Sequence, residues 1–334
     1  MAHSNSSLNC FANCMAKYEH AYIKHTKPCN PPSPHLTFGA MAHEVLYKAG
    51  LLRDEHRDNV GTDDYKTIIP SEILYDDLKQ AFGITSWQNY FLHVIKQVRD
   101  YEETLLTNLL DNDDDVRIER EIKLQLTVEQ LAELGYYGLK QPLVGVIDLL
   151  LVGKNSAVIM DYKFSTSKKG QDEFDMNSQL QLYALMVHIL YDIPLHNISV
   201  GYIDIPKTEF GKPTLLSNGT LSRSKSQNCT QELYEKAVIA IHGEDHPMYN
   251  CKPGGHYYDC WCNLAFNKAA YMTVQYLDLD AYAGITKDVL DAAKMIDFMV
   301  ENNMSFLKKY DSYSCKGCDY IDSCKPWTTV GGFE

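Results

Sequence analysis

Short runs of apolar residues, separated by polar breaks, divide the chain into elements whose type follows from their periodicity. Residues 143–152 (LVGVIDLLLV) and 157–164 (AVIMDYKF) are nearly continuous apolar runs, which predicts two buried strands. Residues 116–126 alternate charged and apolar positions over most of their length, as a half-exposed strand does. Residues 198–205 form a further strand pattern. We therefore expect a sheet built from the middle of the chain.

The segments around these strands have helical patterns. Helices are predicted at 8–24, 39–52, 71–110, about 173–191 and about 286–310, with a proline-rich break at 28–34. In the last of these helices one apolar stripe is formed by Val289, Ala293, Ile296, Val300, Met304 and Leu307. Mixed helices and strands of this kind indicate an α/β protein.

Composition narrows the class. The chain has 334 residues, a formal net charge of −13 and 10 cysteines. Such acidity argues against broad nonspecific adhesion to nucleic acid, although a local basic groove is compatible with it. No apolar run approaches the roughly 20 residues that span a bilayer, and the N-terminus lacks the pattern of a signal peptide. We expect a soluble cytoplasmic protein whose cysteines are metal ligands or free thiols. The acidic run at 111–115 is read as a solvated loop.

The two buried strands are separated by only four residues, GKNS at 153–156, which predicts a hairpin. If Gly153 faces Ser156, then Asp148 lies opposite Asp161. Side chains directly opposed on paired strands are about 5 Å apart at Cβ. Two carboxylates at that distance repel each other, and a divalent cation between them removes the repulsion.

Lys163 follows Asp161 by two positions, so it projects from the same face of the strand. An ammonium there can stabilise charge on a phosphate or orient an attacking water. The alternative for the acidic-x-Lys triplet alone is an ion pair at a strand end. Gln179 and Tyr183 are four residues apart on the following helix and share a face, while His43 is a candidate metal ligand or proton carrier.

The order and spacing of His43, G-x-x-D (145–148), D-Y-K (161–163) and Q-x-x-x-Y (179–183) resemble the RecB-type branch of the PD-(D/E)XK nucleases. The resemblance implies a metal-dependent phosphodiesterase acting on DNA. It assigns His43, Asp148, Asp161 and the Tyr162 carbonyl to a Mg²⁺ or Mn²⁺ ion and makes Lys163 the catalytic lysine. Either Glu119 or Glu121 would match the acidic residue of the family's early strand.

The C-terminal cysteines Cys315, Cys318 and Cys324 have the spacing C-x2-C-x5-C, one thiol short of a four-cysteine site. Spacing alone is compatible with zinc or with an iron–sulfur cluster. The sequence around Cys14 resembles the first ligand of iron–sulfur nucleases, the CRISPR-associated adaptation nucleases and AddB-type helicase-nucleases. That resemblance implies a structural 4Fe–4S cluster, with Cys10 as the competing fourth ligand.

Two further groups of residues are candidates for binding. Four soft ligands within 12 residues could bind zinc, with incidental loop thiols as the alternative: Cys251, His256, Cys260 and Cys262. Residues 221–237 are locally basic and resemble a segment of phage-encoded nucleases of this type. Arg223 and Lys225 could contact a DNA backbone there, or lie in a solvated loop.

We predict a PD-(D/E)XK, restriction-endonuclease-like core, a mixed central sheet flanked by helices, with a cysteine-bound C-terminal cap. The expected organisation is a helical N-terminal region (1–115), the nuclease core (116–206), a loop-rich insertion (207–285) and a C-terminal helix with the cap (286–334). The function would be that of a phage-encoded exonuclease acting in DNA recombination, repair or processing, alone, as a homo-oligomer or with a partner protein. The alternatives are a CRISPR-adaptation-type end-trimming nuclease and a non-catalytic iron–sulfur DNA-binding subunit.

Overall fold

A computed structural model describes most of the chain. The described residues are 2–56, 59–70, 76–110, 115–165, 176–207, 214–219, 221–222, 224, 226–227, 229, 231–243, 265–266, 272–277, 284–309 and 315–324. The predicted strands and most of the predicted helices fall within these ranges.

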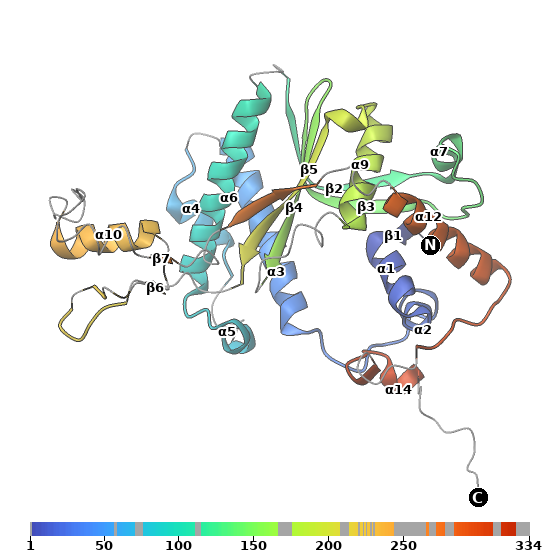
Figure 1. Cartoon of the computed structure of the whole chain (residues 1–334), viewed down its shortest axis with the longest axis horizontal. Helices are drawn as coiled ribbons and strands as arrows, with labels where there is room; N and C mark the ends of the chain where they lie inside the picture. Colours follow the sequence, from blue (N-terminus) through green and yellow to red (C-terminus); the bar gives the residue numbers. More distant parts are fainter. Residues whose placement is uncertain are drawn as a thin grey trace, which may run out of the picture.

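One mixed sheet of six strands forms the centre of the molecule (Figure 1). Its strands are β1 (His3–Ser4), β2 (Arg117–Leu126), β3 (Leu143–Val152), β4 (Ala157–Ser165), β5 (Ile198–Pro206) and β8 (Thr273–Tyr276). Antiparallel pairing joins β2 to β3, β3 to β4 and β5 to β8. The parallel neighbours β4 and β5 are connected through helix α9 (Ser178–Tyr191), the crossover that parallel strands require.

Strand β3 has three partners, and this arrangement opens a fork in the sheet. Along one edge β3 pairs with β2 over nearly its whole length. Along the other edge, β4 pairs with residues 149–152 and β1 pairs with residues 143–144. Between them, residues 145–148 have no ladder partner on this edge in the described part of the chain. Asp148 is therefore the first residue of β3 beyond the β4 ladder.

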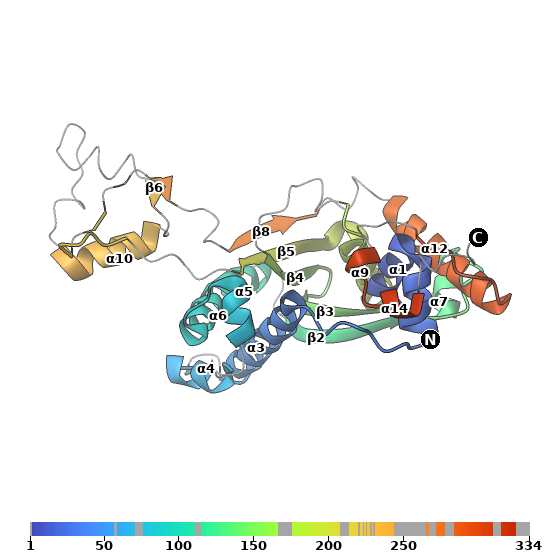
Figure 2. The same cartoon turned by 90° about the horizontal axis from the view of Figure 1, so that it is seen from below.

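Helices cover both faces of the sheet (Figures 1 and 2). One face packs against α1 (Asn5–Asn13), α2 (Met15–Tyr18), α9 and α12 (Gly284–Glu301). The other packs against α3 (Pro34–His56), α4 (Thr62–Ile68), α5 (Asp76–Phe82) and α6 (Trp87–Leu110). Along β4, Ile159 faces the first core while Val158 and Met160 face the second. This burial on both faces explains why the strand reads as a continuous apolar run.

The remaining described elements are short or stand apart. They are η1 (Glu19–Ile23), α7 (Val128–Glu133), η3 (Leu195–Asn197), β6 (Ser226–Gln227), α10 (Gln231–His242), β7 (Ala265–Phe266) and α14 (Ile321–Cys324). The β6–β7 pair and α10 lie away from the central sheet in both views (Figures 1 and 2). No helix among the described residues combines the length and the apolar character needed to cross a membrane.

The predicted helix at 8–24 is interrupted. Helix α1 ends at Asn13, and Cys14 has an extended backbone with φ −161° and ψ 107° before α2 and η1 continue the segment. The amide of Cys14 still donates to the Cys10 carbonyl at 2.9 Å, so the break is local. Because of this break, the Cys14 side chain does not point in the direction that a continuous helix would give it.

The last long helix is shorter than its apolar pattern predicts. Helix α12 ends at Glu301, and Met304 and Leu307 lie beyond it with 46% and 69% of their surface exposed. Val300 is also exposed. The buried stripe that packs on the sheet shares Ala293 and Ile296 with the prediction and has Leu290 and Met299 at its ends. The prediction of a single stripe to residue 307 was wrong at its C-terminal half, because the chain leaves the core there.

Gly145 on β3 lies under α9. A Cβ atom added to it would be 2.7 Å from Cε1 of Tyr183 and 3.1 Å from Sδ of Met186. Only glycine therefore allows the helix bearing Gln179 and Tyr183 to approach the fork this closely.

We expect Gly145→Ala to lower the free energy of unfolding by about 1–3 kcal/mol, because the extra carbon overpacks the contact with Tyr183. Urea denaturation measures this change. Gly39→Ala is the matched control, because a Cβ at that helical position meets nothing within 4 Å. It should be neutral or stabilise by up to about 1 kcal/mol. Equal stability of Gly145→Ala and wild type would contradict the close approach.

Candidate metal centre and active site

The hairpin between β3 and β4 has the register that the sequence predicts. Gly153 donates to the Ser156 carbonyl at 2.9 Å, and Leu149 pairs with Met160. One step beyond that pair, Asp148 and Asp161 face each other across the fork. The Asp148 side chain bends into the gap between the strands, and its Oδ2 accepts the backbone N–H of Tyr162 at 2.7 Å.

A third carboxylate continues this row on β2. Arg120 pairs with Leu149 and Ile122 with Ile147, so Glu121 lies opposite Asp148. Glu121 has φ +47°, a conformation that a non-glycine residue adopts only when its surroundings enforce it. The strained backbone coincides with the position whose carboxylate reaches the fork.

Glu119, the competing candidate, points elsewhere. Its carboxylate accepts from the Tyr191 hydroxyl at 2.6 Å and lies 3.7 Å from Arg117. The structure therefore brings Glu121, and not Glu119, to the other acidic residues. Sequence alone left this choice open because both glutamates lie on the same strand, two residues apart.

His43 on α3 approaches the two acidic residues from the side. Its Nδ1 is 3.3 Å from Asp148 Oδ1 and 3.8 Å from Glu121 Oε1. Burial alone would lower the pKa of His43, but hydrogen bonds to Asp148 and Glu121 raise it to about 10. One ligand atom from each of these three residues lies within 4.8 Å of the other two. One imidazole nitrogen and two carboxylates form a donor set that suits Mn²⁺ or Mg²⁺.

Asp161 lies beside this group and is held by Lys163. The Lys163 ammonium is 2.6 Å from Asp161 Oδ2 and 5.3 Å from the centre of the Tyr202 ring. Asp161 is almost completely buried. Burial raises its pKa to about 6, with the nearby Asp148 charge adding to the effect and Lys163 and His43 opposing it. A further positive charge nearby would therefore stabilise the ionised form of this carboxylate.

Gln179 and Tyr183 on α9 complete the site. The Gln179 amide donates to Asp161 Oδ1 at 3.2 Å and to the Tyr183 hydroxyl at 2.8 Å, and its oxygen accepts from Lys163 Nζ at 3.3 Å. Burial raises the pKa of Tyr183, so its hydroxyl stays protonated at neutral pH. One side chain therefore connects the lysine, the aspartate and the tyrosine.

The four cysteines chosen from the sequence lie together at the other end of the molecule. Cys14, Cys315, Cys318 and Cys324 line one pocket, together with Lys17 and His20. All four are free thiols. Cys10 is not among the residues that line this pocket, and it packs against the core of the sheet.

Several contacts join the N-terminal helices to the C-terminal segment around this pocket. The Ala16 amide donates to the Leu307 carbonyl at 3.1 Å, and Lys17 forms an ion pair with Asp319 at 3.4 Å. The ring of His20 stacks on Tyr320 with centroids 5.9 Å apart. Residues that are about 300 positions apart in the sequence thus form one local structure.

The remaining candidate residues lie outside the described residues. These are the zinc candidates Cys251, His256, Cys260 and Cys262 and the DNA-contacting candidates Arg223 and Lys225. They stay predictions from the sequence.

Glu102 on α6 is a functional candidate that sequence reasoning missed. It contacts Tyr162, the residue between Asp161 and Lys163. A signal was present, because Glu102 continues the buried stripe of Phe91, Ile95 and Val98, where a charged side chain is rare unless it is paired.

Comparison with known proteins agrees with this geometry. Residues 2–325 match the PD-(D/E)XK nuclease superfamily, so the chain belongs to that superfamily and has its fold. Membership indicates a metal-dependent nuclease with DNA as its substrate. A solved structure titled "Crystal structure of SSO0001" covers 85% of this chain and 84% of its own length at 12% identity, with a TM-score of 0.26. No curated protein matches the chain.

The affinity of this site for Mn²⁺ is expected to rise with pH. If His43 and Asp161 are metal donors, binding needs a neutral imidazole and an ionised carboxylate. Their pKa values of about 10 and about 6 then mean that protons compete with the metal. Asp161 becomes protonated as the pH falls through about 6, and His43 must release its proton at any neutral pH. Isothermal titration calorimetry should show at least about tenfold weaker binding at pH 5.5 than at pH 7.5, with proton release. An affinity independent of pH over this interval would contradict the assigned donors.

Proposed function

We propose that this protein is a RecB-like exonuclease that hydrolyses DNA phosphodiester bonds with Mn²⁺ or Mg²⁺. The single observation that carries the proposal is the row of Glu121, Asp148 and Asp161 at the fork of the sheet, with His43 and Lys163 beside it. The association of Gln179 and Tyr183 with Asp161 and Lys163 supports the RecB-like assignment, because their spacing carries that resemblance. An origin in a phage, with a role in recombination, repair or processing, remains part of the proposal.

The metal donors would be His43, Glu121, Asp148 and Asp161, with the Tyr162 carbonyl as a further ligand. When bound, the divalent ion supplies Lewis-acid polarisation of a phosphate oxygen and lowers the pKa of a bound water. Glu121 is included because its carboxylate lies close to His43. The sequence pattern had not decided between Glu119 and Glu121.

Lys163 would stabilise the negative charge that develops on the scissile phosphate. Its ammonium is held at a defined position by Asp161 and by the Gln179 oxygen. Gln179 in turn is hydrogen-bonded to Tyr183 and also donates to Asp161, so the α9 side chains orient both the lysine and one of the proposed metal donors.

We expect Lys163→Ala to lower the cleavage rate about 10²–10³-fold, because one charged group that stabilises the transition state is removed. DNA binding and Mn²⁺ binding should survive. The measurement is digestion of end-labelled single- and double-stranded DNA with Mg²⁺ or Mn²⁺, with uncut circular DNA as the test for a requirement for ends. Lys48→Ala, which removes an exposed lysine paired with Glu44, is the control.

Full cleavage by Lys163→Ala would contradict the assigned role. Wild-type protein that binds DNA and cuts none of these substrates with either metal would favour the non-catalytic DNA-binding subunit. Trimming that stops at a defined overhang would favour the CRISPR-adaptation-type nuclease over a processive exonuclease.

We further propose that Cys14, Cys315, Cys318 and Cys324 hold a structural 4Fe–4S cluster. The supporting observation is that all four line one pocket at the junction of the chain's first helices and its C-terminal segment. Four thiolates can hold either zinc or an iron–sulfur cluster. The resemblance of the sequence around Cys14 to the first ligand of iron–sulfur nucleases is what favours the cluster in this proposal.

Protein purified without oxygen should be brown and contain about four irons per chain. Cys14→Ala should lose the iron and the visible absorbance, because it removes one of four ligands, whereas Cys10→Ala should keep both. Iron and zinc contents are measured by elemental analysis. Colourless protein with one zinc per chain would contradict the cluster. Loss of iron in Cys10→Ala but not in Cys14→Ala would show that Cys10, and not Cys14, is the fourth ligand.

A further inference from the structure

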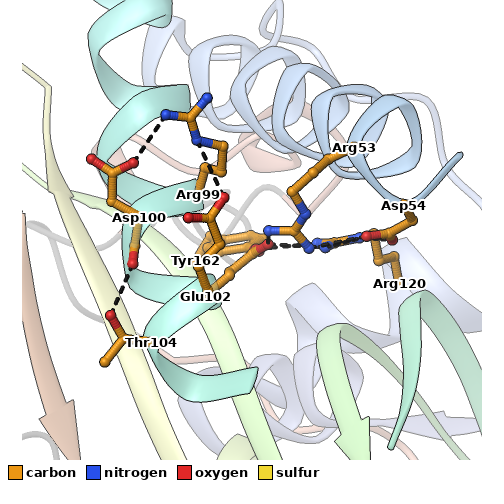
Figure 3. A network of polar contacts seen from close by, with 9 residues as sticks. Arg53, Asp54, Arg99, Asp100, Glu102, Thr104, Arg120 and Tyr162 are labelled. Carbon is orange, nitrogen blue, oxygen red and sulfur yellow. Dashed lines mark hydrogen bonds and ion pairs between the residues drawn. The ribbon is translucent and has the colours of Figure 1, made fainter. Parts of the chain in front are cut away.

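A buried ionic network lies between the strands and the helices α3 and α6 (Figure 3). Its central residue is Glu102 on α6, which accepts hydrogen bonds from Arg53, Arg120 and the Tyr162 hydroxyl. Asp54 closes the network by accepting from Arg120 Nε at 2.7 Å and from Arg53 at 3.0 Å. Four separate elements, α3, α6, β2 and β4, thus converge on one carboxylate.

The charges of this network balance. Two guanidinium groups, of Arg53 and Arg120, face the two carboxylates of Glu102 and Asp54. Burial alone would raise the pKa of Glu102, but Arg120 and Arg53 hold it below its ordinary value. A buried carboxylate of this kind is strongly tied to its partners, because any movement would leave an unpaired charge.

Two arms of the network end next to residues of the metal centre. Arg120 immediately precedes Glu121 on β2. Tyr162 separates Asp161 from Lys163, and its backbone N–H donates to Asp148. Along β4 successive residues point to opposite faces, so anchoring Tyr162 in the interior fixes the direction of Asp161 and Lys163. At Arg120 the network instead holds the backbone immediately before the positive φ of Glu121.

The third arm runs along α3. Arg53 lies on the same helix as His43, so its bond to Glu102 ties the position of that helix to β2 and β4. Gly50 on this helix leaves space for the Arg120 guanidinium, since a Cβ there would lie 2.5 Å from Nε. The helix and the arginine are thus fitted to each other at the point where the network crosses from β2 to α3.

We propose that Glu102 is a positioning residue that sets the spacing of the metal donors His43, Glu121, Asp148 and Asp161. This inference rests on the proposed metal-dependent function. The donors include three carboxylates that repel one another, so the spacing needs an external support. Glu102 supplies it from the buried face through Arg120, Tyr162 and Arg53, without touching the metal or the substrate.

Tyr162→Phe is the sharpest test, because it removes one hydroxyl and leaves all charges paired and the Tyr162 backbone in place. We expect its Mn²⁺ affinity, measured by calorimetry without DNA, to fall about 10-fold or more, as for other residues that orient metal ligands. Tyr101→Phe is the matched control. Tyr101 precedes Glu102 on α6, and its hydroxyl is hydrogen-bonded to that of Tyr276 on β8, outside the network.

Glu102→Asp is the second variant, because it keeps the charge balance and withdraws the carboxylate from Tyr162. It should shift the Mn²⁺ affinity in the same direction, with near-ultraviolet circular dichroism and thermal unfolding verifying the fold. Wild-type affinity in both folded variants would overturn the inference. Failure of the metal site itself is distinguishable, because wild type would then bind Mn²⁺ no better than Asp148→Ala does.

Discussion

Mutual repulsion among Glu121, Asp148 and Asp161 is the constraint around which this structure is organised. They occupy neighbouring positions on three strands, where like charges disfavour one another and burial adds to the cost. The protein relieves this with two cationic groups, the imidazole of His43 and the ammonium of Lys163. The fork in the sheet makes the arrangement possible, because β3 and β4 separate where the carboxylates meet. A divalent ion would take over the neutralising role that His43 now shares.

The two faces of β4 have different roles. On one side Asp161 and Lys163 meet the α9 side chains, and on the other Tyr162 enters the network centred on Glu102. Because side chains alternate along β4, Asp161 and Lys163 are both adjacent in sequence to Tyr162, which is fixed in the interior. A site placed on strands and backed by a satisfied polar network is held more precisely than one carried by loops. The same alternation lets β4 be apolar over most of its length and still present polar groups at its end.

Much of the site could be predicted because hairpin geometry is local. The GKNS turn and two apolar runs sufficed for the register that places Asp148 against Asp161. Glu121 could not be separated from Glu119, because the distinction depends on a positive φ and on the position of α3, both of which are tertiary properties. The prediction of one continuous helix at 8–24 was wrong at Cys14, because the apolar periodicity of a sequence does not reveal a single residue with an extended backbone. Pairing of the distant chain segments around the cysteine pocket was inferred from resemblance, since no local pattern encodes it.

The joining of Ala16 to Leu307 has a consequence for biogenesis. A ribosome that adds about 5–20 residues per second needs roughly 15–60 seconds to make the intervening chain. During that interval Leu8, Phe11 and Tyr18, which are buried in the finished protein, lack the partners that α12 provides. These apolar side chains stay without that cover until residues 284–301 have been made. If the four cysteines hold a cluster as proposed, its assembly has to wait for residues 315–324, because three of the four thiols lie there.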